Sequence, residues 1–144
     1  MLFAKRKRHL HRLLIVEDEP LVAFDSETML REWDYEVVAT VDRYADAAAI
    51  LDAQAVDLVL TDMTLAGERT GMDVARYAAG KGVPVMFVSG TCPADAEGHA
   101  LACLAKPYGE RTLKAALDTV DRHLSGDKAG KPPAGFSFYA DSAR

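Results

Sequence analysis

Short apolar runs alternate with longer amphipathic stretches through most of this sequence. Five runs are rich in Val, Leu, Ile or Ala and have the length of buried strands: residues 13–16, 37–41, 58–60, 83–88 and 101–105. The intervening stretches repeat apolar positions at helical spacing, which predicts helices over 20–33, 44–53, 72–79 and 110–124. Strands that alternate with helices specify an α/β domain with a five-stranded parallel sheet and right-handed crossovers.

The connection between the last two predicted strands is unusually short. Only ten residues, 91–100, form most of this crossover, and they include Pro93 and Gly98. A crossover between parallel strands, including its helix, needs at least about 10–12 residues. We therefore expect the fourth helix to be short or frayed.

Both ends of the chain lack the periodicity of the central part. Residues 1–11 are basic and predict a disordered flank, so the folded domain is expected over 12–125. Residues 126–144 are rich in Gly, Lys and Pro, which predicts a flexible tail that is too short to fold into a DNA-binding domain. Three aromatic residues in this tail, Phe136, Phe138 and Tyr139, are costly to leave exposed. Docking of this segment on its own domain or on a partner remains open.

Charge is divided unevenly along the 144 residues. The chain holds 17 Lys and Arg against 22 Asp and Glu, for a net charge of −5. Five of the basic residues fall within residues 1–12, which hold no acidic residue, so the remainder has 12 basic against 22 acidic residues, or −10. An acidic domain is a poor candidate for binding nucleic acid.

The sequence predicts neither a membrane span nor a secretion signal. No apolar run approaches the roughly 18–20 residues that cross a bilayer. The apolar stretch 13–16 is also too short for the core of a signal peptide, which needs about 7–15 residues. Two cysteines, Cys92 and Cys103, are too few for a disulfide-framed scaffold and are expected as unpaired bystanders. We therefore predict a cytoplasmic protein.

Charged and hydroxyl side chains follow four of the predicted strands. Glu17 and Asp18 follow the first strand, Asp62 the third, Ser89 the fourth and Lys106 the fifth. Ligands of open parallel sheets bind outside the carboxyl ends of the strands. Three carboxylates form an oxygen-rich site that suits Mg²⁺, while a lysine and a hydroxyl suit phosphoryl oxygens. One carboxylate can then be the nucleophile of aspartyl-phosphate chemistry.

These strand ends, read together, resemble the receiver domain of two-component response regulators. The resemblance covers residues 11–125 and rests on the segment 13–20, on Asp62, on Ser89 and on Lys106-Pro107. It implies a flavodoxin-like (βα)5 three-layer sandwich with a five-stranded parallel sheet. In receivers the bond that corresponds to Lys106-Pro107 is commonly cis, a geometry that bonds to proline tolerate best.

The resemblance also implies a role for each matched residue. Asp62 resembles the phosphoacceptor, Ser89 the residue that hydrogen-bonds the phosphoryl group, and Lys106 the residue that pairs with it. Mg²⁺ is implied as the cofactor, bound directly by Asp18 and Asp62 and through water by Glu17. The backbone carbonyl of Thr64 is implied to complete the protein's ligands.

Two segments, 62–75 and 84–90, resemble more narrowly the "FAT GUY" receivers, which are partners of HWE-type histidine kinases. The match departs from that pattern at Thr91, which replaces a tyrosine, and at Val85, which replaces a phenylalanine. Ordinary receivers carry an aromatic switch residue three positions before the lysine, where this chain has Cys103. The usual aromatic switch is therefore not implied.

The predicted function is that of a single-domain response regulator. Asp62 accepts a phosphoryl group from the phosphohistidine of a sensor histidine kinase, HWE-type by the narrower resemblance, or of a phosphotransfer protein. Self-phosphorylation and autodephosphorylation are the only reactions expected, so the protein is not predicted to be an enzyme. Its signal passes by protein contact to a downstream partner, through the surface around the fourth strand, the fourth helix and the fifth strand, with no DNA or membrane partner.

Other readings of the same residues remain. A phosphorelay intermediate or a phosphate sink would use the same site. A haloacid-dehalogenase-like phosphatase needs a second acid two residues after the nucleophile, and that position is Thr64. A nucleotide-binding module needs a Gly-rich loop after the first strand, which is missing. A receiver-like domain that no longer accepts phosphate would lack a site residue, and none is absent.

Overall fold

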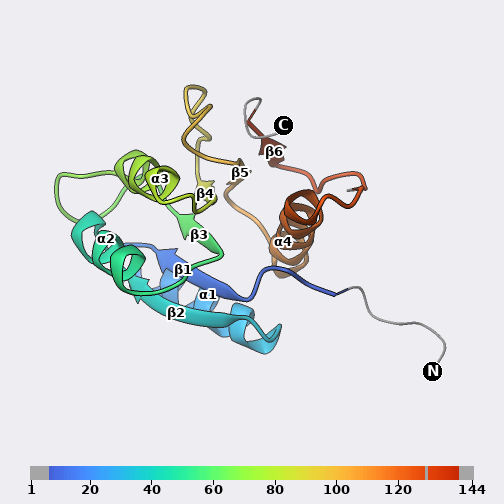
Figure 1. Cartoon of the computed structure of the whole chain (residues 1–144), viewed down its shortest axis with the longest axis horizontal. Coiled ribbons are helices and arrows are strands. Elements are labelled where there is room, and N and C mark those ends of the chain that lie inside the picture. The colour runs from blue at the N-terminus through green and yellow to red at the C-terminus, as the bar shows by residue number, and fades with distance from the viewer. Residues whose placement is uncertain (1–6, 129, 140–144) are drawn as a thin grey trace.

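The computed structural model describes residues 7–128 and 130–139. Along these residues run six strands and four helices (Figure 1). The strands are β1 (Arg12–Val16), β2 (Glu36–Val41), β3 (Leu58–Thr61), β4 (Val85–Ser89), β5 (Ala102–Ala105) and β6 (Phe136–Phe138). The helices are α1 (Pro20–Glu32), α2 (Tyr44–Ala53), α3 (Gly71–Gly80) and α4 (Glu110–Ser125).

The six strands form one sheet in the order β2-β1-β3-β4-β5-β6. The first five strands pair in parallel, whereas β6 pairs antiparallel with β5. The order of the parallel strands is that of flavodoxin-like sheets, which confirms the predicted fold class. The predicted five-stranded sheet and short fourth helix need correction, because β6 is added and no helix forms between β4 and β5 in the described chain.

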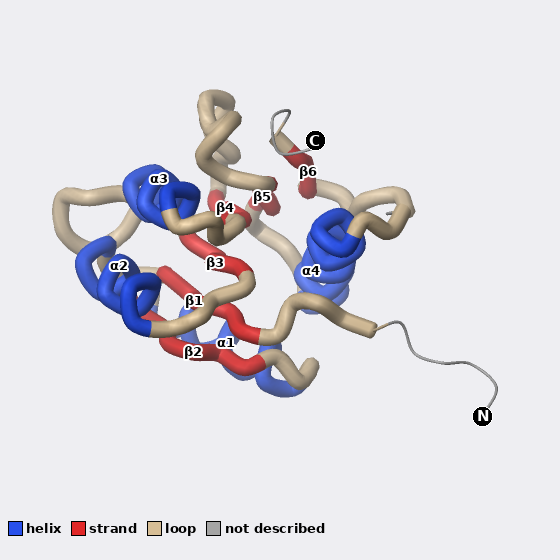
Figure 2. Tube along the Cα trace, in the orientation of Figure 1, coloured by secondary structure: helices blue, strands red, loops and turns tan. Residues whose placement is uncertain are grey.

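Helices cover both faces of the sheet (Figure 2). Strand side chains alternate between the faces, so Leu13 and Ile15 of β1 pack in the core under α1 and α4. Leu14 and Val16 pack in the other core, under α2 and α3. Because both faces are buried, the central strands are continuous apolar runs rather than alternating ones.

The helix ends follow from local sequence. Pro20 begins α1, where the missing backbone N–H removes no intrahelical hydrogen bond. Thr70 and Asp73 form a reciprocal capping box at the start of α3, in which the Thr70 backbone N–H donates to Asp73 at 2.8 Å. Gly126 ends α4 in the left-handed conformation, with a φ of 82°. The first two of these signals begin the helices that follow β1 and β3, the strands that lead to the candidate carboxylates.

The C-terminal segment docks on its own domain. Phe136, Ser137 and Phe138 pair with Leu104, Cys103 and Ala102 of β5. The next residue, Tyr139, is buried with its ring edge-on to Phe87, and its hydroxyl donates to the Pro93 carbonyl oxygen at 2.8 Å. The prediction of a flexible tail therefore does not hold for residues 136–139, because burial of the aromatic rings offsets the cost of ordering them. Residues 129 and 140–144 lie outside the described residues.

The end of the basic flank is also ordered. The Arg8 guanidinium donates to the carbonyl oxygens of Trp33 and Asp34 at 2.9 and 2.8 Å. The backbone N–H groups of His9 and Leu10 both donate to one carboxylate oxygen of Asp121, each at 2.8 Å. The predicted disorder over 1–11 is thus wrong for residues 8–10, because the Arg8 side chain binds two backbone carbonyls and a distant carboxylate binds the backbone of His9 and Leu10. The remaining basic residues of positions 1–6 lie outside the described residues.

The segment between β4 and β5 projects beyond the strands as a loop without a helix (Figure 1). A disulfide joins Cys92 in this loop to Cys103 in β5, whose Cα atoms lie 5.9 Å apart. The expectation of two unpaired cysteines is therefore wrong, because parallel pairing of β4 and β5 brings the loop back over β5. No helix in the described part of the chain is long and apolar enough to cross a membrane.

Candidate functional site

Strand register brings the predicted carboxylates together. Val16 of β1 and Thr61 of β3 are paired, and the Asp62 backbone N–H donates to the Val16 carbonyl oxygen at 3.1 Å. Glu17 and Asp62 therefore leave adjacent strands side by side. Carboxylate oxygens of Glu17, Asp18 and Asp62 all lie within 4.8 Å of one another. No other such cluster of potential metal ligands occurs among the described residues.

Lys106 reaches this cluster from β5. Its backbone N–H donates to the Ser89 carbonyl oxygen at 2.7 Å, which fixes the chain just beyond the sheet. Its Nζ lies 2.8 Å from Asp62 Oδ2 and 3.1 Å from Glu17 Oε1. Burial lowers the pKa of the ammonium, but the hydrogen bonds to the two carboxylates outweigh this effect and raise the pKa above its usual value. Lys106 is thus a fixed cation, and its bond to Pro107 is cis.

Glu17 is the most enclosed of the three acids. Its exposed fraction is only 4%, and burial raises the pKa of its carboxyl, opposed by the hydrogen bond from Lys106 and by that from the Glu19 backbone. Asp18 and Asp62 are half-buried and line an open pocket of about 630 Å³. A ligand in the pocket can therefore reach Asp18 and Asp62, while Glu17 lies beneath them.

Ser89 and Thr64 line the same pocket. The Ser89 hydroxyl donates to the Thr91 carbonyl oxygen at 3.0 Å and accepts a longer bond, 3.4 Å, from the Thr91 backbone N–H. The Thr64 backbone N–H donates to Asp62 Oδ1 at 3.3 Å. The two oxygens of Asp62 are therefore held by different partners, Oδ1 by Thr64 and Oδ2 by Lys106. All six predicted site residues lie together at this edge of the sheet.

The family model described as the response regulator receiver domain matches residues 13–118. The chain belongs to the receiver-domain family of response regulators. That membership supports a phosphoacceptor role in signalling, and receivers are generally phosphoacceptors rather than enzymes.

Solved structures agree with this membership. A response regulator receiver protein from Sinorhizobium medicae is 25% identical, with a TM-score of 0.66 over 76% of this chain and 93% of that one. The receiver domain of a sensor histidine kinase from Pseudomonas aeruginosa, with a magnesium ion in its active-site cleft, is 26% identical, with a TM-score of 0.63 over 75% and 94%. The response regulator PhyR from Brucella abortus is 26% identical, with a TM-score of 0.68 over 83% of this chain and 51% of PhyR. No curated protein matches the sequence.

The receiver's donor set fits a divalent cation. Three carboxylates face one ammonium, so the cluster keeps an excess of negative charge within 4.8 Å. Mg²⁺ prefers oxygen ligands, retains waters and commonly binds one or two carboxylates with a phosphate oxygen. The half-buried Asp18 and Asp62 supply carboxylates on an open pocket that has room for those waters.

Gly71, the first residue of α3, supports the site and was not among the predicted site residues. A Cβ at this position would collide with the backbone carbonyl of Asp62. The Gly71 backbone N–H also donates to the Met63 carbonyl oxygen at 2.8 Å, which holds α3 against the loop after β3. The sequence signal for this role was a glycine directly before the predicted helix 72–79, at a position where no turn requires glycine.

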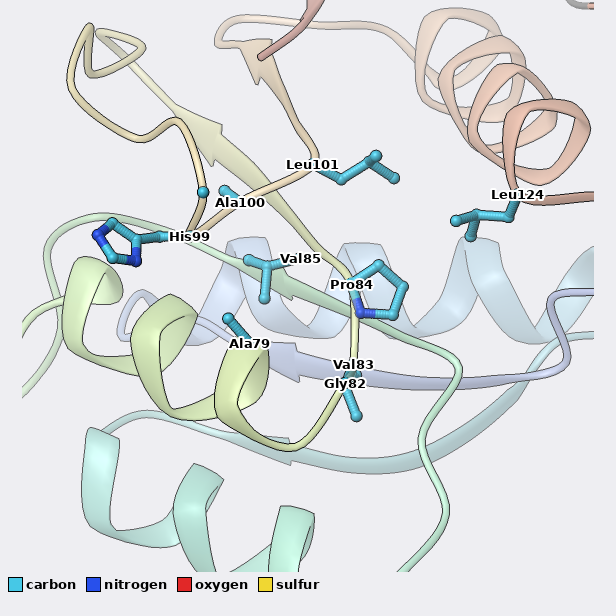
Figure 3. A pocket seen from close by; sticks show the side chains of 10 residues that line it. Ala79, Gly82, Val83, Pro84, Val85, His99, Ala100, Leu101 and Leu124 are labelled. Atoms are coloured by element: carbon cyan, nitrogen blue, oxygen red, sulfur yellow. The ribbon is translucent and has the colours of Figure 1, made fainter. Parts of the chain in front are cut away.

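A second hollow lies at the opposite end of β4 and β5 and has different chemistry (Figure 3). Pro84, Val85 and Leu101 line it from the strand starts, and Leu124 reaches it from α4. Its side chains are apolar except for His99. It therefore provides neither the carboxylates nor the lysine of the receiver site.

Proposed function

We propose that the Asp62 carboxylate of this receiver accepts a phosphoryl group from the phosphohistidine of a histidine kinase or a phosphotransfer protein. The observation that carries the proposal is the placement of Asp62 Oδ2 2.8 Å from Lys106 Nζ, inside the carboxylate cluster and on an open pocket. An Asp62 oxygen attacks phosphorus, a P–O bond forms, and the P–N bond breaks with its electron pair left on the imidazole.

The neighbouring side chains stabilise the negative charge on the oxygens of the transferred phosphoryl group. Lys106 is close enough to pair with a phosphoryl oxygen once Asp62 carries the group. Rotation of the Ser89 hydroxyl away from the Thr91 carbonyl lets it donate to another phosphoryl oxygen. Mg²⁺ would be held by Asp18, Asp62 and the Thr64 carbonyl, with Glu17 acting through water, and would offset the charge of the phosphoryl oxygens.

The donor protein is proposed to dock on α1 beside the site. Leu21 and Phe24 are 80% and 68% exposed on the first turns of this helix, which begins directly after the acidic residues. A hollow of about 270 Å³ lies between α1 and the Lys106–Tyr108 segment, and Val22 and Asp25, their sequence neighbours, line it. Exposed apolar side chains next to the acceptor favour a protein donor over a small molecule. An HWE-type kinase partner and membership of the FAT GUY subclass are proposed from the sequence resemblance. A cytoplasmic location is proposed from the sequence, which predicts neither a membrane span nor a secretion signal.

Intact mass measures the proposed reaction. The protein is incubated with Mg²⁺ and a small acyl phosphate, and a single phosphoryl adduct is expected on the wild type. Asp62→Ala and Asp62→Asn should gain none, and a chelator should abolish the adduct. Glu32→Gln, which changes an exposed acid at the far end of α1, is the matched control and should react like the wild type. An adduct retained by Asp62→Ala, or none on the wild type, contradicts the proposal.

The output alternatives differ in how long the acyl phosphate lasts. A regulator that binds a downstream protein requires the modified state to persist, whereas a relay intermediate passes the group to a second phosphotransfer protein and a sink loses it to water. Decay of the mass adduct, with and without a phosphotransfer protein, separates these cases. A phosphatase is disfavoured because Thr64 supplies no general acid.

A further inference from the structure

The disulfide between Cys92 and Cys103 joins two residues that differ in their exposure to solvent. Cys103 lies within β5 and has an exposed fraction of 0%, whereas Cys92 is half-buried in the loop before it. The separation of their Cα atoms, 5.9 Å, is within the range that a disulfide requires. Small-molecule thiols and disulfides can therefore reach Cys92 more readily than Cys103.

The tethered loop forms one wall of the phosphoacceptor pocket. Thr91 and Pro93, on either side of Cys92, line this pocket together with Asp62 and Lys106. The loop has no helix or strand of its own. The loop is also held by the hydrogen bonds between Ser89 and Thr91, by the bond from Tyr139 to Pro93, and by Ala96, which is buried in the core. The disulfide is thus the covalent restraint on this wall.

We propose that Cys92 and Cys103 are a reversible thiol–disulfide site that controls phosphorylation of Asp62, an inference that rests on the proposed function. In the disulfide form the wall holds Thr91 where its carbonyl accepts the Ser89 hydroxyl. That hydroxyl must turn to the incoming phosphoryl group. Reduction breaks the bond between Cys92 and Cys103, so Thr91 can move away from Ser89. The Ser89 hydroxyl then no longer donates to the Thr91 carbonyl. The reduced protein therefore accepts phosphate faster.

The redox step needs a thiol–disulfide partner, such as glutathione. In oxidation, the Cys92 thiolate attacks one sulfur of the small disulfide and forms a mixed disulfide, releasing one thiol. Cys103 as its thiolate then attacks Cys92 Sγ, so the protein disulfide forms and a second thiol leaves. Two electrons and two protons pass from the cysteines to the small disulfide, which becomes two thiols. Reduction reverses both steps. Disulfides of this transient kind are the ones found in reducing compartments.

The first measurement does not depend on phosphorylation. The full chain is equilibrated with oxidised or reduced glutathione, and its free thiols are alkylated and counted by intact mass. Wild type and Asp62→Ala should both lose their two reactive thiols in the oxidised buffer and recover them in the reduced one. Failure of the internal disulfide to form, or to be reduced, overturns the proposal.

The second measurement is the rate of adduct formation with Mg²⁺ and a small acyl phosphate. Reduced wild type should react at least about fivefold faster than oxidised wild type, the lower end of ordinary coupling between sites. Cys92→Ser should react at the reduced rate in either buffer. Cys92 is half-buried, so this variant disturbs the core less than a change at Cys103. If Cys92→Ser fails to fold, the comparison of oxidised with reduced wild type still tests the proposal.

The outcomes separate the two proposals. A normal adduct that forms equally fast in both redox states, or faster in the oxidised state, overturns redox control and leaves the proposed function intact. Absence of an adduct in both states overturns the proposed function and, with it, the control of Asp62 by this disulfide.

Discussion

The hydroxyl of Tyr139 donates a hydrogen bond to the carbonyl oxygen of Pro93 at 2.8 Å, joining the C-terminal segment to the wall of the receiver pocket. The same tyrosine packs its ring edge-on against Phe87 of β4. A residue beyond the last helix therefore contacts Pro93, which lines the same pocket as Asp62 and Lys106. The contribution of this contact to folding can be measured separately from that of the ring.

Tyr139→Phe should lower the free energy of unfolding by about 1 kcal/mol, because the ring remains packed while one hydrogen bond is lost. Urea denaturation measures the difference. Tyr44→Phe is a suitable control, since the Tyr44 ring contacts Tyr77 and Arg69 on the surface. An unchanged stability for Tyr139→Phe would show that the hydroxyl bond contributes nothing net.

Alkaline pH should weaken the same contact. Burial, and then the nearby Glu97 and Asp95, raise the pKa of Tyr139 from 10.0 to about 12. A pKa raised by folding means that the neutral phenol is favoured in the folded state, so its stabilisation is complete below pH 10 and is lost as the pH rises toward 12. The wild type should therefore lose stability more steeply than Tyr139→Phe over this interval. Parallel stability curves for the two proteins would contradict the prediction.

Gly71→Ala should impair both stability and phosphorylation, because the new methyl group collides with the Asp62 backbone. Relief of the clash should cost about 1–3 kcal/mol. A displacement of Asp62 by about 1 Å should also slow adduct formation by up to about 100-fold. Gly80→Ala at the end of the same helix is the control, because a methyl group there meets no atom within 4 Å. Equal adduct rates for the two variants would exclude a positioning role for Gly71.

Asp121→Ala should destabilise the protein by about 2–4 kcal/mol, because it leaves the backbone N–H groups of His9 and Leu10 without their acceptor. Asp121 has an exposed fraction of 0%. Asp118→Ala on the same helix is the control. Its carboxylate is 55% exposed and pairs with Arg122, and such surface pairs contribute only about 0–1 kcal/mol. Similar losses for both variants would argue against anchoring of the N-terminal residues by Asp121.

The parallel part of the fold could be predicted because its signals are local. Buried strands such as β1 are continuous apolar runs, and α2 occupies the predicted residues 44–53. The site followed from one topological rule, since parallel pairing of β1 and β3 places Glu17 beside Asp62 without any further information.

The remaining features depend on contacts distant in sequence. Three residues of β6 are too few to show a strand period, and their pairing depends on the free edge of β5. The order of residues 9 and 10 depends on Asp121, more than a hundred positions away. Prediction of the disulfide between Cys92 and Cys103 would have required knowledge of the path of the loop after β4, whose sequence has no periodic pattern. Gly71 is needed because a side chain there would collide with the Asp62 backbone, a contact that the residue type alone does not reveal.

The antiparallel strand β6 has a consequence for the behaviour of the protein at high concentration. It satisfies the outer backbone groups of β5, a strand of wholly apolar sequence, Ala102–Ala105. An uncovered apolar strand at a sheet edge is a template for the strand of another molecule. Removal of Phe136–Phe138 would therefore expose the apolar edge of β5. The shortened protein should then aggregate in addition to losing stability. We expect β6, with only three residues, to be a poorer template than β5 for the strand of a neighbouring copy.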